Sequence, residues 1–323
     1  MSETGRPLVV IPGDYPPQIA ESPHLERLRA HAKVVLNADR PADDVEQLRR
    51  VHEATAIINS RSQVKWPGPL LRQLPNLKML TVCGIGTDAI DLETARELGI
   101  TVCNVPGRTA PIVAEHAFAL LMAVSRRTAW FTSELQAGRW QRVLSTSLVG
   151  KRLGVVGTGH IGCEMIRLAN RFGMEVVAWS FHPSADKAER FGFRYVDFKE
   201  LLQTSDAVSL HVKLTADSRH LIGETELQLM KPGVLLVNTS RGDVVETGAL
   251  VAALKSGHLG GAALDVFDSE PLPPQHPLLE CEQVVLTPHC ADQTPEGVDL
   301  LNAGCVDNVI AFLQGRPQNV VAS

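Results

Sequence analysis

Apolar runs alternate with amphipathic segments along the first hundred residues, and this pattern predicts strands and helices in turn. Short runs rich in branched side chains are typical of buried strands, whereas apolar positions three or four apart are typical of helices. The predicted strands are 8–13, 34–36, 56–59, 79–83 and 100–104. The predicted helices are 25–32, 44–51 and 92–98, the last closed by Gly99. This alternation favours a parallel sheet with helices on both faces.

A long apolar helix, 111–127, separates this region from a second series of elements. Its wide apolar stripe predicts burial between two domains or two subunits. Residues 130–147 are then predicted to be a polar excursion. The second series has strands at 153–157, 176–180, 207–211, 234–239, 262–266 and 284–287, and a final helix at about 295–314. Six parallel strands are enough for a full dinucleotide-binding sheet.

The first strand of this second series leads into a glycine-rich turn, Gly157-Thr158-Gly159-His160-Ile161-Gly162, and then into a helix. This order is the dinucleotide-binding fingerprint. The first glycine allows the tight turn, the second lets a pyrophosphate approach the backbone, and the third lets the helix pack closely. The phosphates then lie at the positive end of the helix dipole. A tight strand-to-helix turn without a ligand is the alternative interpretation. About 150 residues precede the turn, enough for a separate domain.

Composition narrows the class of protein. The 323 residues, the net charge of −5 and the 44% hydrophobic content suit about two globular domains rather than a disordered chain. No apolar run approaches the length of a membrane span, and residues 1–7 lack the apolar segment of a signal peptide. No basic run with interleaved aromatic residues suggests nucleic acid. We therefore expect a cytoplasmic protein that binds neither membranes nor nucleic acid.

Six cysteines occur, none of them in a C-x-x-C pair. This pattern predicts reduced thiols and no metal site. Cys83 and Cys290 fall near the expected active site, where we interpret them as packing residues rather than catalytic thiols.

Three polar residues, Arg241, Glu270 and His289, follow predicted strands in the second half of the chain. An arginine can hold a carboxylate in a bidentate fork, and a histidine can transfer a proton near neutral pH. A carboxylate beside the histidine fixes its tautomer and favours its charged form. Together these groups suit the interconversion of a hydroxyl and a carbonyl beside a carboxylate. Alternatively, each is a solvated or backbone-bonded residue that follows a strand.

Seven motifs in order make the sequence resemble the D-isomer-specific 2-hydroxyacid dehydrogenase family, most strongly over residues 83–294. They are Gly84-Ile85-Gly86-Thr87-Asp88, Val113-Ala114-Glu115-His116, the glycine turn, Met230-Lys231-Pro232-Gly233, Asn238-Thr239-Ser240-Arg241-Gly242, Leu264-Asp265-Val266-Phe267 with Glu270-Pro271, and Thr287-Pro288-His289. The resemblance implies an α/β fold: a Rossmann-type doubly wound parallel sheet plus a smaller flavodoxin-like substrate domain. It also implies an NAD(P)-dependent oxidoreductase.

The resemblance further implies a role for each matching residue. His289 resembles the general acid/base, Glu270 its carboxylate partner, and Arg241 the residue that binds the substrate carboxylate and polarises the carbonyl. The loop of Gly84, Ile85 and Gly86 resembles the one whose amides hold that carboxylate, and we add Arg61 to the substrate-binding set. The expected cofactor-binding residues are Gly157, Gly159, His160, Ile161, Gly162, Ser180, Thr239 and Asp265.

The same resemblance implies a domain division and an assembly. Residues 1–104 with 291–323 would form the substrate-binding domain, and residues 105–290 the dinucleotide-binding domain. Members of the family are usually homodimers built through the cofactor domains and the helix at 111–127.

The choice of cofactor depends on Ser180, which ends the second strand of the dinucleotide-binding series. An acidic residue that binds the ribose hydroxyls of NAD is expected there. Its absence removes the repulsion against the 2′-phosphate of NADP, yet no arginine follows in the next few positions to bind that phosphate. His182 or Lys187 could do so, or could simply be solvated. We favour NAD, with NADP as a nearly equal alternative.

Departures from the family pattern bear on the substrate. Asn59 stands where an arginine is frequent in relatives that act on phosphorylated hydroxyacids, and Ile85 where phosphite-oxidising relatives have lysine. Glu270 argues against formate oxidation, for which relatives tend to use glutamine. Asp292 stands where glycine is common, and we expect it to cap the C-terminal helix. Tuning of His289, or repulsion of a second anionic group on the substrate, are the other interpretations of Asp292.

These observations predict hydride transfer between a nicotinamide cofactor and a small D-2-hydroxy acid or 2-keto acid, such as glyoxylate or hydroxypyruvate. A nucleotide-sensing corepressor-type protein on the same fold is an alternative from another class, because such proteins can retain the catalytic residues. A formate- or phosphite-type dehydrogenase is the remaining alternative.

Overall fold

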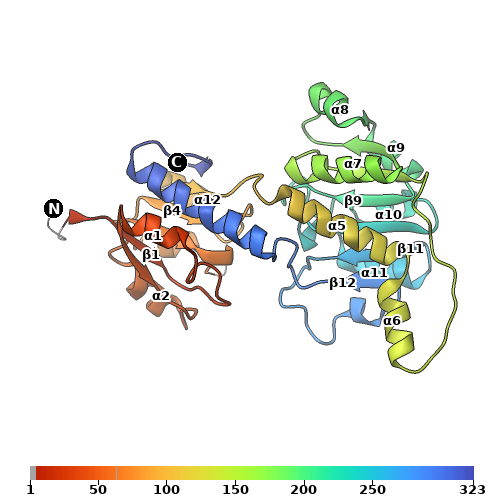
Figure 1. The fold of residues 1–323 in the computed structure, drawn as a ribbon, viewed down its shortest axis with the longest axis horizontal. Helices are drawn as coiled ribbons and strands as arrows, with labels where there is room; N and C mark the ends of the chain where they lie inside the picture. The colour runs from red at the N-terminus through yellow and green to blue at the C-terminus, as the bar shows by residue number, and fades with distance from the viewer. Residues whose placement is uncertain (1–4, 63) are drawn as a thin grey trace. The chain divides into compact units, whose positions relative to one another are not determined.

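The computed structural model describes residues 5–62 and 64–323 (Figure 1). The chain divides into two compact units. One comprises the chain up to Thr109 together with Gln293–Ser323, and the other comprises Ala110–Asp292. Both boundaries fall a few residues after those expected at 104 and 290, and residues 1–4 of the expected first range lie outside the described residues. The ligand that each unit binds remains a prediction.

The first unit contains a six-stranded sheet in the order β13-β5-β4-β3-β1-β2. Strands β1 to β5 are parallel and in flavodoxin-like order, and β13 is an antiparallel edge strand, so the expected flavodoxin-like class is confirmed. The strands are β1 Leu8–Ile11, β2 Lys33–Leu36, β3 Ala56–Asn59, β4 Met79–Val82, β5 Thr101–Cys103 and β13 Val320–Ala322. The helices are α1 His24–Arg29, α2 Asp44–Val51, α3 Gly68–Leu71, α4 Leu92–Glu97, α12 Pro295–Leu313 and the 3-10 turn η2 Ser60–Ser62.

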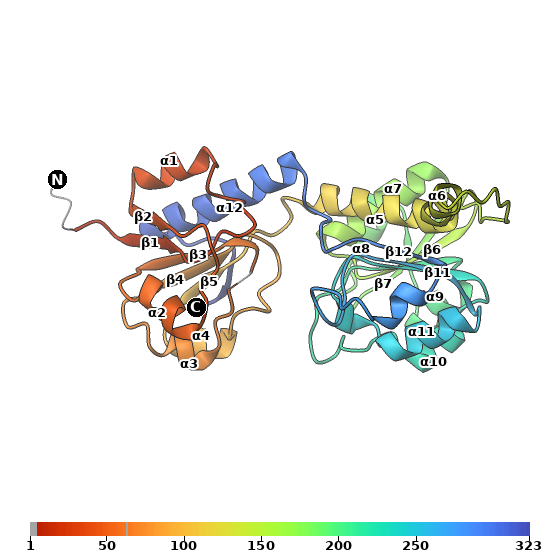
Figure 2. The same ribbon diagram turned by 90° about the horizontal axis from the view of Figure 1, so that it is seen from below.

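Helices cover both faces of this sheet (Figure 2). Helices α1 and α12 lie on one face, and α2, α3 and α4 lie on the other. The C-terminal helix contributes Leu301, Cys305 and Val306 to the same core as Val9 and Ile11 of β1. The chain therefore completes its first unit with its last thirty or so residues, after passing through the second.

The second unit contains a parallel seven-stranded sheet in the order β12-β11-β10-β9-β6-β7-β8. The order reverses between β9 and β6, which is the topological switch point of a doubly wound sheet, so the expected Rossmann-type class is confirmed. The strands are β6 Arg152–Val156, β7 Glu175–Trp179, β8 Arg194–Tyr195, β9 Ala207–Leu210, β10 Val234–Asn238, β11 Leu259–Leu264 and β12 Val284–Leu286. The helices are α5 Ala110–Ser125, α6 Thr128–Gln136, α7 His160–Phe172, α8 Ala185–Phe191, α9 Phe198–Thr204, α10 Glu224–Leu229, α11 Thr247–Lys255 and the 3-10 turns η3 Gly242–Val244 and η4 Pro277–Glu280.

This second sheet is also covered on both faces. Helices α5 and α7 lie on one face, and α9, α10 and α11 lie on the other (Figure 2). Strand β10 is buried along its whole length, as expected for a central parallel strand with an unbroken apolar sequence. Helix α5 buries the predicted stripe, including Val113, Ala117 and Leu121. Across the described residues, no helix combines the length and apolarity that crossing a membrane would require.

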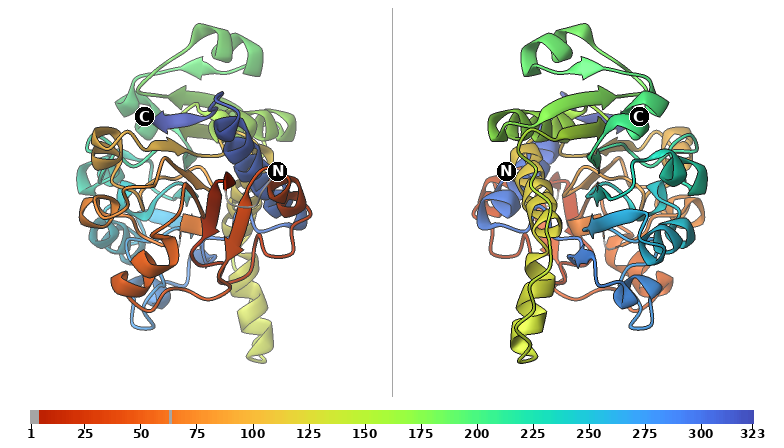
Figure 3. Two further views of the ribbon diagram at one scale, coloured as in Figure 1. Left: turned by 90° about the vertical axis from the view of Figure 1, so that its left-hand side faces the viewer. Right: turned by 90° about the vertical axis from the view of Figure 1, so that its right-hand side faces the viewer.

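Helix α6 occupies a region for which the sequence predicts a polar excursion. Arg127 adopts a left-handed backbone (φ 52°, ψ 33°) and separates α5 from α6. Helix α6 buries none of its residues, so it has no apolar stripe that would have signalled a helix. Helix α6 projects from the rest of the second unit (Figure 3), and residues 137–149 return to that unit, where Leu148 is buried in the core. Helix α6 and residues 137–149 together form an arm. Trp140 and Leu144 on this arm are 77% and 96% exposed.

Candidate active site

The glycine turn joins β6 to α7 at the switch point of the second sheet. A Cβ added at Gly157, whose φ is +99°, would lie 2.6 Å from the carbonyl oxygen of His211, and one at Gly162 would lie 2.0 Å from that of Gly157. Only glycine fits these two positions. Gly159, in contrast, has nothing within 4 Å of an added Cβ and forms the N-cap of the 13-residue helix α7. Its open backbone at a helix N-terminus suits a pyrophosphate.

Two buried polar atoms at the carboxyl ends of strands in this sheet lack a hydrogen-bond partner among the described residues: Nδ1 of His211, after β9, and Oγ1 of Thr239, after β10. Burial lowers the pKa of His211 to about 4, so its ring is neutral near pH 7. Unsatisfied buried polar atoms are costly, and the ribose and amide groups of a nicotinamide nucleotide would satisfy them. The residues present therefore fit such a cofactor. The sequence indicates Thr239 but assigns no role to His211, whose one signal is its place at the end of a strand.

The end of β7 shows what could surround the adenosine ribose. Ser180 accepts a hydrogen bond on Oγ from the His182 backbone N–H at 3.2 Å. Lys187 of α8 donates from Nζ to the carbonyl oxygen of Thr158 at 2.9 Å, which places an ammonium group against the glycine turn. His160 and Ile161 form the first turn of α7 beside it.

His289 and Glu270 form a hydrogen-bonded pair in the second unit. The Nδ1 atom of His289 lies 2.7 Å from Oε2 of Glu270, and the Phe267 backbone N–H donates to Oε1 of the same carboxylate at 3.0 Å. The two side chains are 48% and 37% exposed. Because the carboxylate is held on one side and engages Nδ1 on the other, Nε2 of His289 remains for proton exchange.

The pair shifts both pKa values toward the charged forms. The hydrogen bond to Glu270 raises the pKa of His289, against partial burial and the positive charge of Arg241. Partial burial opposes ionisation of Glu270, but the hydrogen bond and charge of His289 outweigh it and lower the pKa of Glu270. Both shifts favour an imidazolium–carboxylate pair, whose imidazolium proton can be transferred.

The backbone of His289 is left-handed, with φ of 51°, a conformation that costs free energy for a residue with a side chain. Asp265, 1% exposed after β11, holds it there. Its carboxylate accepts from Thr287 Oγ1 at 2.6 Å and from the backbone N–H groups of Cys290 and Ala291 at 2.9 and 3.0 Å. These bonds clamp the loop on both sides of His289. The sequence assigns Asp265 to the cofactor and gives no sign of this clamp.

Arg241 follows β10 in a turn that packs tightly against the chain leading to Glu270. A Cβ added at Gly242 would lie 1.9 Å from the carbonyl carbon of Phe267. The guanidinium donates from Nη1 to the Ser240 carbonyl oxygen at 2.7 Å. Its charge lowers the pKa of both His289 and Glu270, so the structure brings the three predicted catalytic residues into one electrostatic group.

In the first unit, the predicted substrate loop Gly84–Gly86 follows β4. Its carbonyl oxygens accept hydrogen bonds within the unit: from Val105 N at 2.8 Å, from Asn104 Nδ2 at 2.7 Å and from Ser62 Oγ at 3.5 Å. These bonds fix the backbone of the loop.

Arg61 lies beside this loop in the same unit. Its backbone is left-handed (φ 52°, ψ 19°), and its Nη2 donates to Oε1 of Gln293. Its Nε is buried without a hydrogen-bond partner among the described residues. A guanidinium with a donor to spare suits an anionic or hydroxyl group of a ligand.

Two features indicated by the sequence, the cap at Asp292 and the motif at residues 230–233, have no part in the site as described. The expectation that Asp292 caps the C-terminal helix is wrong, because Thr294 accepts from the Gly297 backbone N–H at 3.0 Å and Pro295 occupies the first turn. The motif that contains Lys231 lies at the amino end of β10, where Lys231 pairs with Asp206 at 3.0 Å. That motif therefore supports the sheet at the end opposite the glycine turn.

Comparison with known proteins defines the class. Residues 118–291 match the family model described as "D-isomer specific 2-hydroxyacid dehydrogenase, NAD binding domain". The chain is also 40% identical over 284 residues to a glyoxylate reductase of Thermococcus litoralis, covering 85% of each chain. The chain belongs to the D-isomer-specific 2-hydroxyacid dehydrogenase family, as its ordered motifs predict.

Solved structures of similar chains contain two different cofactors, NADPH in one and NAD in another. An acyclic imino acid reductase (Bsp5) in complex with NADPH and D-Arg has a TM-score of 0.88 and 27% identity, covering 97% of this chain and 99% of that one. A D-lactate dehydrogenase from Aquifex aeolicus complexed with NAD and lactic acid has a TM-score of 0.85 and 28% identity, covering 98% and 99%. These similarities support a nicotinamide cofactor without choosing between its two forms.

Proposed function

We propose that this protein is an NAD(P)-dependent D-2-hydroxyacid dehydrogenase that reduces small 2-keto acids such as glyoxylate or hydroxypyruvate. The hydrogen-bonded pair of His289 and Glu270, 2.7 Å apart, is the observation that carries the proposal. The relative from Thermococcus litoralis, a glyoxylate reductase, supports the choice of substrate.

In this proposal His289 supplies the proton. Its raised pKa favours the protonated imidazole, and Glu270 fixes the ring through Nδ1. Its Nε2–H then protonates the oxygen of the keto group as that oxygen becomes an alkoxide. A reduced nicotinamide held by the glycine turn would supply the hydride for the keto carbon. The neutral His289 regains its proton from solvent, and in the oxidative direction it acts as the base.

Arg241 is proposed to bind the substrate carboxylate and to stabilise the charge that develops on the carbonyl oxygen. The loop Gly84–Gly86 and Arg61 of the first unit are proposed to bind substrate. The fixed backbone of that loop and the spare donor of Arg61 support this assignment.

The glycine turn, Ser180, Thr239 and Asp265 are proposed to bind the cofactor, which we take to be NAD because no arginine follows Ser180 before residue 190. Lys187 is the observation in favour of NADP, since its ammonium group lies on the glycine turn. Comparing kcat/KM for NADH and NADPH in wild type and Lys187→Met tests the choice. A wild-type preference for NADPH that Lys187→Met abolishes would overturn the assignment of NAD as the cofactor.

A panel of 2-keto acids, followed by absorbance loss with NADH and with NADPH, tests the function itself. We expect turnover with glyoxylate or hydroxypyruvate and none with 3-phosphohydroxypyruvate, formate or phosphite in the matching direction. Nucleotide binding without turnover of any acid would contradict the proposal and support the nucleotide-sensing alternative.

We also propose a cytoplasmic homodimer built through the second unit and its helix at 111–127, in which α6 and residues 137–149 also bury exposed side chains against a second copy. Trp140, Leu144 and Val149 on this arm are 77%, 96% and 66% exposed, and a group of exposed apolar side chains is typical of an interaction site. Sedimentation should show a dimer that Leu144→Asp converts to monomer. Leu279→Asp, at a residue 50% exposed outside the arm, is the matched control and should remain dimeric. A monomeric wild type would refute the proposal.

A further inference from the structure

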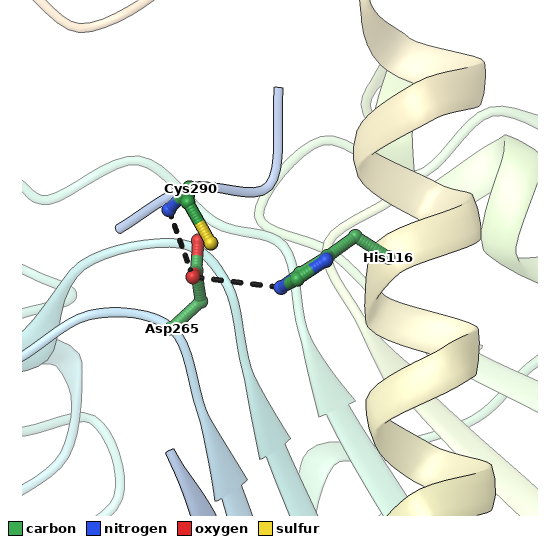
Figure 4. A group of neighbouring side chains, drawn as sticks. All are labelled: His116, Asp265 and Cys290. Atoms are coloured by element: carbon green, nitrogen blue, oxygen red, sulfur yellow. Dashed lines mark hydrogen bonds and ion pairs between the residues drawn. The ribbon is translucent and has the colours of Figure 1, made fainter. Parts of the chain in front are cut away.

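A cluster of three side chains beside His289 has the donor set of a transition-metal site. His116 comes from α5, Asp265 from the end of β11 and Cys290 from the loop after β12 (Figure 4). One ligand atom of each lies within 4.8 Å of the others. We propose that these residues bind a thiophilic divalent cation, Zn²⁺ in the first place, and that its binding reversibly inhibits the enzyme.

The donor chemistry selects the ion. Imidazole nitrogen, carboxylate oxygen and thiolate sulfur are the three ligand types that Zn²⁺ prefers, whereas Mg²⁺ and Ca²⁺ take oxygen alone. Ligand atoms of a tetrahedral Zn²⁺ lie about 3.3–3.7 Å apart. Nε2 of His116 is already 3.5 Å from Oδ1 of Asp265. Side-chain movements of about 1 Å would bring the remaining atoms to that separation, with water as the fourth ligand.

Asp265 is prepared for a cation. It is buried, and its ion-pair partner among the described residues is His116 rather than a permanently charged side chain. Two of its three hydrogen bonds, from Thr287 Oγ1 and the Cys290 backbone N–H, fall on Oδ1, and the third, from the Ala291 backbone N–H, falls on Oδ2, so the open acceptor position of the carboxylate is on Oδ2. The same bonds orient the carboxylate as an outer coordination shell does in metal sites.

Metal binding would act on His289 through the loop that carries it. The Cys290 thiol would lose its proton to solvent on forming the metal–sulfur bond. His116 would exchange its contact with Thr287 Oγ1, 3.1 Å away, for the metal, with its proton passing from Nε2 to Nδ1 through solvent. Because Cys290 directly follows His289, these changes alter the clamp that holds the acid/base. This inhibitory consequence rests on the proposed function, but the metal site itself does not.

Titration of the chelator-treated full-length protein with Co²⁺ tests the site without any need for turnover. We expect a thiolate-to-cobalt charge-transfer band that saturates at one Co²⁺ per chain, is displaced by Zn²⁺ and is unaffected by Mg²⁺. Cys290→Ser should abolish the band, whereas Cys281→Ser, at a buried cysteine outside the cluster, should retain it. His116→Gln should weaken Co²⁺ binding by about 10- to 100-fold or more. Circular dichroism confirms that each variant is folded.

A wild type without the band, a Cys290→Ser variant that keeps it, or unchanged Co²⁺ affinity in His116→Gln would each overturn the site. Loss of keto acid reduction with Zn²⁺ and its recovery with a chelator test the inhibition separately. A protein that shows the band but reduces no keto acid retains the metal site and loses the proposed function. A protein that reduces keto acids but shows no band retains the proposed function and loses the metal site.

Discussion

Two histidines follow strands of the same sheet in the second unit, yet their protonation differs. The hydrogen bond to Glu270 raises the pKa of His289, after β12. Burial lowers the pKa of His211, after β9, to about 4, and its Nε2 lies 2.8 Å from the neutral hydroxyl oxygen of Ser209. The residue type and the place at a strand end are shared, so the burial of His211 and the carboxylate partner of His289 make the difference. His289 suits proton transfer, whereas His211 suits neutral polar contact with a ligand.

Removing each imidazole should separate these roles most strongly. His289→Ala should lower kcat for keto acid reduction by about 10²–10⁴-fold, because it removes the general acid. His211→Gln should change kcat by less than about tenfold, because it removes hydrogen bonding alone. Steady-state kinetics on both variants measures the contrast. Wild-type turnover by His289→Ala would end the assignment of the acid.

The depressed pKa of His211 should also appear in stability. An unfolded histidine takes up a proton near pH 6.5, whereas the folded His211 takes one up only near about 4. The folded state therefore loses stability as pH falls from about 6.5 to about 4, by up to about 3 kcal/mol. Urea unfolding at pH 7 and at pH 5 should show a smaller loss for His211→Gln than for wild type. Equal losses would mean that His211 does not titrate in this way.

Much of the fold can be predicted from the sequence because long apolar strands and glycine turns each have a recognisable local sequence pattern. Elements such as α3, β8 and β13 are too short to show a period, so the sequence does not reveal them. The clamp of Asp265 on residues 287–291 joins positions more than twenty residues apart through single hydrogen bonds, which no local pattern encodes. His289, Glu270 and Arg241 are identifiable from ordered motifs, although their roles stay predictions.

Substitutions of Arg241 should have a smaller effect on activity, and they also test what sets the pKa of His289. Arg241→Lys keeps the charge but loses the bidentate fork, so kcat/KM should fall by about 10- to 100-fold, chiefly through a higher KM. Arg241→Gln also removes the charge that opposes protonation of His289, so the apparent pKa of that residue should rise further. Kinetics over a range of pH measures both effects. An unchanged KM in both variants would remove Arg241 from substrate binding.

The most direct test of the account is the pH dependence of kcat/KM for glyoxylate reduction in wild type and Glu270→Gln. Reduction needs protonated His289, so wild-type activity should be lost as pH rises through a pKa above 6.5, the ordinary value of histidine. Removal of the carboxylate should move this limb to lower pH by about 1–3 pH units, because an opposite charge shifts a pKa by that much. A limb that stays in place in Glu270→Gln would contradict the claim that this pair holds the proton.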